Sequence, residues 1–140
     1  MRAARTHFFV DNFNLNHWLV IKVCVHTQVA VVYEPMPVKN TNARRDKVRR
    51  YLYFLSRLTD DGSFLNYSIE VVVGGTVVGF PAQLDGVSCG VFAAILLYHI
   101  ITGATVDFDT RDFVTWRKFI ASKMEDVCHC VKLARRVDRE

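Results

Sequence analysis

Two runs of mainly β-branched and apolar residues stand out near the start of the chain, HWLVIKVCV at 17–25 and QVAVVYE at 28–34. Runs of this kind predict strands, and the two residues between them predict a hairpin or two adjacent strands. Pro35 and Pro37 follow the second run and end it, because proline has no N–H to donate to a sheet.

The pattern then becomes helical. One apolar stripe predicts an amphipathic helix over about 43–58: Val48, Tyr51, Leu52 and Leu55. The stretch YSIEVVVGGTVVGF, residues 67–80, has two strand-like halves on either side of Gly74-Gly75, which predicts a hairpin with a two-residue turn. A phosphate-binding loop is the alternative for these glycines, but neither the Lys-Ser/Thr nor the helix that such a loop requires follows them.

The rest of the chain is predicted to be mainly helical. Residues 89–102 are apolar on nearly all sides, so we expect a central buried helix that Gly103 ends. A last helix is predicted from about Thr110, with one apolar stripe: Phe113, Trp116, Ile120, Met124, Val127 and Val131. The order of strands, helix, strands, helix and helix is typical of an α+β domain, and residues 1–140 are expected to form a single one.

Composition narrows the class of protein. The 140 residues, 51% hydrophobic and 23% charged, suit one globular domain. No apolar run is long enough for a membrane span, and the N-terminus lacks the apolar stretch of a secretory signal. The four cysteines are scattered in a domain that does not need disulfides, which favours a reducing compartment. We therefore expect an intracellular protein with no membrane partner.

The net charge of +4 comes largely from NARRDKVRR, residues 42–50. This basic cluster could contact nucleic acid or an acidic protein, or act as a nuclear address. It coincides with the predicted amphipathic helix, so we interpret it as a solvated face with the arginines outside. A nucleic-acid partner is not expected.

The stretch QLDGVSCGVF, residues 83–92, carries the candidate chemistry. Taken alone, Cys89 is better explained as a buried core thiol. It also opens the predicted helix, where unpaired N–H groups and the helix dipole favour a thiolate nucleophile. The amide of Gln83 could donate to a developing oxyanion, and Gly86 and Gly90 leave room for a substrate main chain. Asp85 could contact substrate or support its own turn.

A nucleophilic thiol needs a base, and His17 is the best placed of five histidines. It starts the first predicted strand, and Glu34 ends the second. If the strands pair as a hairpin, the two residues lie close together. The result is a Cys-His-acid set in which the carboxylate orients the imidazole.

These residues resemble the ubiquitin-like-protein-specific (SUMO-protease-type) cysteine peptidases. His17-Trp18 opens a strand, an acid ends the next strand seventeen positions later, and Gln83 stands six residues before Cys89. QLDGVSCGVF is similar to the nucleophile motif of that family, and NHWLVIKV is similar to its histidine motif. The resemblance extends from about Phe9 to Ile101.

The resemblance implies a papain-like cysteine proteinase fold, with a central mixed or antiparallel sheet and the nucleophile at the N-terminus of a buried helix. It implies His17 as the base, Cys89 as the nucleophile and Gln83 as the oxyanion-hole donor, with Trp18 covering a channel for a diglycine tail. The family usually has Asp where this chain has Glu34. It also carries a longer segment before the histidine than the sixteen residues present here, so a shortened domain is expected.

The function implied is hydrolysis after the C-terminal Gly-Gly of a ubiquitin-like protein such as SUMO, in a precursor or a lysine conjugate. No cofactor is expected, the partner is a ubiquitin-like protein or its conjugates, and we expect a monomer in the nucleus or cytoplasm. Three alternatives stay open. One is a non-catalytic relative that binds a ubiquitin-like protein. The second is a viral or mobile-element-like protease of the same fold. The third is a basic scaffold that acts through the cluster at 44–50 and would bind nucleic acid in a salt-sensitive manner.

Cys128-His129-Cys130 suggests a zinc site at first sight. Residues two apart on a helix point to nearly opposite sides, however, so they cannot converge on one metal ion. No metal site is expected.

Overall fold

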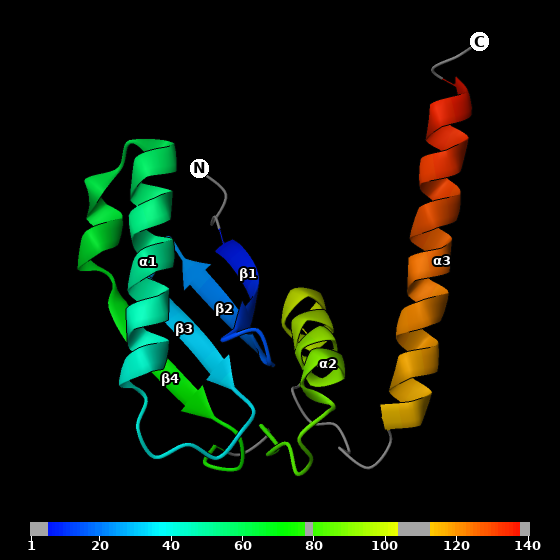
Figure 1. Cartoon of the computed structure of the whole chain (residues 1–140). Helices are drawn as coiled ribbons and strands as arrows, with labels where there is room; N and C mark the ends of the chain where they lie inside the picture. The colour runs from blue at the N-terminus through cyan, green and yellow to red at the C-terminus, as the bar shows by residue number, and fades with distance from the viewer. Residues whose placement is uncertain (1–5, 78–79, 104–112, 138–140) are drawn as a thin grey trace.

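The computed structural model describes residues 6–77, 80–103 and 113–137, and the side chains of the last helix as far as Glu125. It has the predicted α+β architecture, with four strands in one mixed sheet. Figure 1 shows the elements in order along the chain. Their bounds are β1 Thr6–Phe13, β2 His17–Cys24, β3 Val29–Glu34, α1 Asn42–Thr59, a short 3-10 helix Gly62–Asn66, β4 Ser68–Val73, α2 Cys89–Thr102 and α3 Phe113–Val137.

The sheet has the strand order β1-β2-β3-β4. The predicted hairpin is present, because β2 pairs with β3 in antiparallel register from Val20 opposite Tyr33 to Cys24 opposite Val29. β1 pairs with β2 antiparallel, and β4 pairs with β3 parallel, with Glu34 opposite Val73. The antiparallel pairs and the one parallel pair make the sheet mixed.

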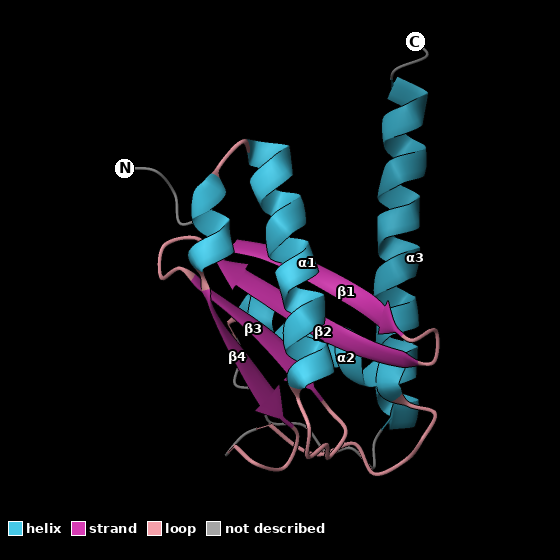
Figure 2. Cartoon of the chain, turned by 60° about the vertical axis from the view of Figure 1, so that its left-hand side comes forward, coloured by secondary structure: helices cyan, strands magenta, loops and turns pink. Residues whose placement is uncertain are grey.

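Helices cover both faces of the sheet (Figure 2). Alternate residues of a strand point to opposite faces, and β2 shows this clearly. Leu19, Ile21 and Val23 face α1 and its buried Val48, Leu52 and Leu55. Val20 faces the other way, into a second core with Phe92, Ile95 and Leu96 of α2.

The bounds of α2 agree with the prediction, and Gly103 ends the helix in the left-handed conformation with φ of 72°. The expectation that α2 is buried nearly all round is wrong. Phe92, Ala93, Ile95 and Leu96 are buried against the sheet, while Tyr98 and Ile101 are exposed. α3 lies beside α2 and extends past its end (Figure 1).

Two further expectations need correction or lie outside the described residues. The predicted hairpin around Gly74-Gly75 is wrong: β4 ends at Val73, and the described residues after it form a turn and an isolated bridge between Val77 and Phe80. The predicted start of the last helix near Thr110 and the side chains of Cys128, His129 and Cys130 lie outside the described part of the chain.

Candidate active site

The structure brings His17 and Glu34 together as the hairpin geometry predicts. His17 is the first residue of β2 and Glu34 the last of β3, so antiparallel pairing places both at one end of the sheet. His17 Nε2 lies 2.6 Å from Glu34 Oε1. The Glu34 side chain is fully buried and that of His17 is 14% exposed. The longer glutamate side chain therefore reaches the imidazole.

Three donors bind the Glu34 carboxylate, and they divide between its oxygens. The Met36 backbone N–H donates to Oε1 at 2.8 Å, alongside His17, and Arg44 Nε donates to Oε2 at 2.8 Å. Burial raises the pKa of Glu34, but the hydrogen bonds from His17, Arg44 and Met36 outweigh it and hold this pKa below its ordinary value. Glu34 is therefore an ionised acceptor at neutral pH.

This hydrogen bond determines which nitrogen of His17 can act as a base. An ionised carboxylate only accepts hydrogen bonds, so Nε2 carries a proton toward Glu34 Oε1. In the neutral ring the second nitrogen, Nδ1, then keeps its lone pair. The arrangement orients His17 to accept a proton at Nδ1.

The contact of Arg44 with the candidate acid is a feature that the sequence interpretation missed. The basic cluster was expected to be a solvated face with its arginines outside, and this is wrong for Arg44 and Arg45. The Arg44 side chain is 17% exposed and bonded to the buried Glu34, while Arg45 donates to the Ile69 carbonyl. Arg49 and Arg50 are exposed, as expected. Helical periodicity alone could not separate the two pairs.

Cys89 is the first residue of α2 and is buried, with 7% of its surface exposed. The turn before it is fixed by Asp85, whose Oδ1 accepts from the N–H groups of Val87 at 2.8 Å and Ser88 at 2.6 Å. This confirms the turn-supporting role considered for Asp85, and its contact with substrate stays a prediction. Ser88 follows as the N-cap of α2.

Trp18 and the two glycines define the space around the nucleophile. A Cβ at Gly90 would lie 3.4 Å from Trp18 Cδ1, so the indole packs directly on the residue after Cys89. Trp18 is 37% exposed, which leaves part of the ring accessible. A Cβ at Gly86 would meet no atom within 4 Å, so Gly86 borders open space. The predicted substrate-binding residues thus lie next to the nucleophile turn.

Gln83 is almost fully buried, with 2% exposed. Its backbone N–H donates to the Pro35 carbonyl at 2.9 Å, which ties the nucleophile loop to the end of the acid-bearing strand. The side-chain Nε2 donates to the Asp85 carbonyl at 2.6 Å, and one of its two hydrogens remains for another acceptor. Its Oε1 is buried with no hydrogen-bond partner among the described residues. The oxyanion role of Gln83 stays a prediction.

Gly74 has a packing role that its prediction as a hairpin turn did not include. A Cβ there would lie 2.5 Å from the Pro35 carbonyl oxygen and 2.8 Å from that of Pro81. The Gly74 N–H also donates to the Glu34 carbonyl at 2.7 Å. Glycine at this position lets the segment leading to Gln83 pass close to the end of β3.

A cavity of about 340 Å³ joins several of these residues. Its lining includes His17, Gln83, Gly86 and Arg44, together with the turn between β1 and β2. This cavity therefore borders both the predicted base and the predicted oxyanion donor.

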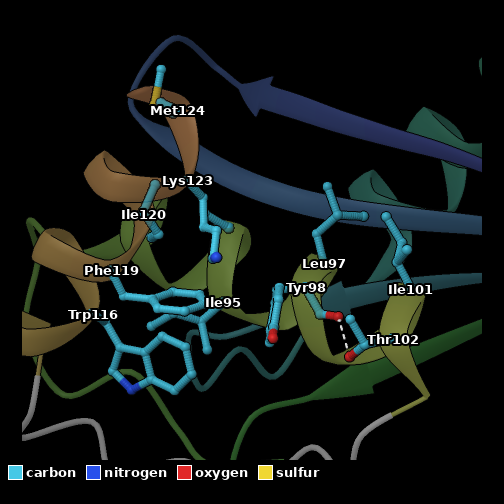
Figure 3. A pocket seen from close by; sticks show the side chains of 11 residues that line it. Ile95, Leu97, Tyr98, Ile101, Thr102, Trp116, Phe119, Ile120, Lys123 and Met124 are labelled. Atoms are coloured by element: carbon cyan, nitrogen blue, oxygen red, sulfur yellow. Dashed lines mark hydrogen bonds between the residues drawn. The ribbon is translucent and has the colours of Figure 1, made fainter. Parts of the chain in front are cut away.

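A second cavity, of about 410 Å³, lies between α2 and α3 and has a different character (Figure 3). Aliphatic and aromatic side chains of both helices line it, with Trp116 and Phe119 of α3 facing Ile95 and Tyr98 of α2. It contains neither the nucleophile nor the histidine-acid pair. We call this second cavity the α2–α3 groove.

No group of three metal-ligating side chains is placed to hold an ion in the part of the chain that the structure describes. None of the described helices combines the length and the apolar character needed to cross a membrane.

Comparison with known proteins places the chain in a family. The family of Ulp1 proteases, C-terminal catalytic domain, matches residues 8–132. A crystal structure of the C-terminal Ulp1 protease domain in complex with Smt3, the yeast ortholog of SUMO, aligns with a TM-score of 0.70 and 16% identity. The SUMO protease Ulp1 with its catalytic cysteine oxidised to a sulfonic acid gives the same values.

Both alignments cover 83% of this chain and 50% of the solved one, so the chain spans about half the length of these structures. No curated protein matches the chain significantly. The structural likeness confirms the expected fold, and the family match extends over most of the sequence. The chain belongs to the Ulp1 protease family.

Proposed function

We propose that this chain is a thiol peptidase or isopeptidase that cleaves after the C-terminal Gly-Gly of a ubiquitin-like protein such as SUMO. The observation that carries the proposal is the 2.6 Å contact between His17 Nε2 and the buried Glu34, at the end of the sheet where Trp18 packs on the first turn of α2. A nucleophile position, an oriented base and a buried acid are the parts that acyl transfer through a thioester requires.

In the proposed cycle His17 Nδ1 takes the proton of Cys89, and the Sγ attacks the carbonyl carbon of the terminal glycine. The free hydrogen of Gln83 Nε2 donates to the oxyanion. The C–N bond breaks as His17 returns the proton to the leaving amine, which leaves a thioester on Cys89. Water, deprotonated by His17, then hydrolyses the thioester and restores the thiol.

The substrate class follows from two features. The indole of Trp18 packs directly on Gly90 and leaves little room beside the nucleophile turn, which suits a diglycine tail without side chains. The aligned Ulp1 domain was solved in complex with the SUMO ortholog Smt3, which supports a ubiquitin-like partner here. We propose that the protein acts as a monomer in the nucleus or cytoplasm.

The decisive test is covalent labelling of the purified chain. Ubiquitin-like proteins, SUMO included, are offered with a thiol-reactive group at the C-terminus. A stable adduct is expected with the native sequence, a much slower one with His17→Ala and none with Cys89→Ala. Cys24→Ala is the matched control, because Cys24 is a free thiol at the opposite end of β2 and should leave labelling unchanged.

Absence of an adduct with every probe, from a chain shown to be folded, would contradict the peptidase proposal. Non-covalent binding of the same probes would then favour a binding role. An adduct that persists in Cys89→Ala would place the reactive thiol elsewhere.

A further inference from the structure

The Glu34 carboxylate is bonded to two different cationic or potentially cationic groups, one on each oxygen. Oε1 receives His17 Nε2 at 2.6 Å, and Oε2 receives Arg44 Nε at 2.8 Å. The carboxylate itself is fully buried. Such a group is stable only if positive charge and hydrogen bonds compensate its removal from water.

The Arg44 side chain is itself held in place. Its guanidinium lies over the Phe13 ring, 4.7 Å from the ring centroid, and the side chain is 17% exposed. Arg44 also stands in the first turn of α1, so its backbone is fixed by the helix. The contact with Glu34 is therefore held by packing on both sides and is unlike a mobile surface ion pair.

Other charged groups nearby have their own partners. Lys47 pairs with Asp11 at 3.1 Å, and Arg49 pairs with Asp46 on the outer face of α1. β4 places Val73 opposite Glu34, and the loop after β3 adds the Met36 N–H. Among the described residues, His17 and Arg44 are the titratable or charged side chains recorded against Glu34.

We propose that Arg44 is the positioning residue of the histidine-acid pair: it anchors the second oxygen of Glu34 and supplies the positive charge that His17 would otherwise have to carry. The first effect directs Oε1 at the imidazole. The second leaves His17 free to be neutral, with Nδ1 able to accept a proton. This inference rests on the proposed role of His17 as the base.

The physical reason is a choice between two cations. A buried carboxylate without Arg44 would keep the adjacent imidazole protonated, because the imidazolium would be its one remaining cationic partner. A histidine locked in this form is no longer available as a base near neutral pH. Arg44 stays charged at all working pH values, so it is suited to be the permanent partner.

The test is an NMR titration of the His17 imidazole, which needs no substrate. A failure of this inference is therefore distinguishable from a failure to label Cys89. The His17 signal is identified by its loss in His17→Asn. In Arg44→Met the titration midpoint of His17 is expected to rise by about one pH unit or more, the usual scale for a nearby charge. Arg44→Lys keeps the charge and should stay near the native midpoint.

Two further variants make the result decisive. Arg44→Gln keeps an N–H donor but not the charge, so it should raise the His17 midpoint as Arg44→Met does. If Arg44→Met does not fold, Arg44→Gln takes its place. Arg50→Met removes an equal charge from an exposed position of the same helix and should leave the midpoint unchanged. A midpoint that is unchanged or lowered without the Arg44 charge would overturn the inference.

Discussion

The acid corner, formed by His17, Glu34 and Arg44, and the α2–α3 groove lie in one domain but depend on different interactions. In the acid corner each carboxylate oxygen has a named donor at 2.6 to 2.8 Å, and the acid is excluded from water. In the α2–α3 groove apolar side chains line an open cavity, and Ile101 and Met124 remain more than half exposed.

The difference shows what each region can do. Directional bonds fix an imidazole to within a fraction of an ångström, which catalysis requires. Apolar contact supplies area but little direction. Substitutions in the acid corner should therefore lower stability and activity. Substitutions in the groove should have little effect unless they reach the buried core beneath it.

The largest effect is expected from Glu34→Ala. The change leaves Arg44 partly buried without its carboxylate and opens a cavity at the end of β3. Removing one partner of a buried ion pair destabilises a protein by about 3–5 kcal/mol. Urea unfolding at pH 7 measures the effect, and labelling of Cys89 should also become slower.

Glu70→Ala is the matched control, because Glu70 is an exposed acid on the neighbouring β4. An exposed substitution should stay within about 0.5 kcal/mol of the native free energy of unfolding. Equal losses from the two variants would remove the contrast between a buried and an exposed carboxylate.

A smaller, pH-dependent effect is expected from Glu34→Gln. The pKa of Glu34 is lower in the folded chain than its ordinary value of 4.5. The native chain then takes up a proton less readily than the unfolded chain, so the Glu34 contribution is fully present above pH 4.5 and is lost as the pH falls through the lower folded pKa. Glu34→Gln lacks this contribution.

The measurement is the free energy of unfolding of both proteins between pH 7 and pH 3. Their difference should be constant near neutral pH and should shrink on acidification. Other carboxyls also have lowered pKa values; for Asp85 the hydrogen bond from the Val87 N–H is the main cause. These groups are the same in both proteins, so the difference between the two curves isolates Glu34. A difference that stays constant down to pH 3 would mean that the folded chain does not perturb the Glu34 carboxyl.

The parts of the site that could be predicted from sequence are those set by local rules. The hairpin of β2 and β3 follows from two β-branched runs, and the pairing itself brings His17 to Glu34. The bounds of α2 follow from an apolar run and a glycine that adopts the left-handed conformation. These features depend on residues close in the chain or on one strand pairing.

The parts that could not be predicted depend on contacts between elements. Arg44 and Arg49 look alike in the helical pattern, and only the packing of α1 against the sheet places the former beside a buried acid. The Gly74-Gly75 pair suggested a hairpin turn. The close approach of Gly74 to Pro35 and Pro81 could not be predicted, because it depends on how a distant loop packs. β1 was not predicted at all, although it supplies Phe13 beneath Arg44.

The smallest effect is expected on the outer side of α2. Ile101 lines the α2–α3 groove and is 61% exposed, so Ile101→Ser should change the free energy of unfolding by no more than about 0.5 kcal/mol. Leu96 lies on the same helix but is 1% exposed, and Leu96→Ala should cost about 2–5 kcal/mol because it leaves a cavity against the sheet. Urea unfolding of the two variants compares the outer and inner faces of α2 directly. If Ile101→Ser lowers the free energy of unfolding by more than about 1 kcal/mol, α3 closes over the groove in solution. Both regions would then be shielded from water, and they would differ only in whether polar or apolar contacts hold them together.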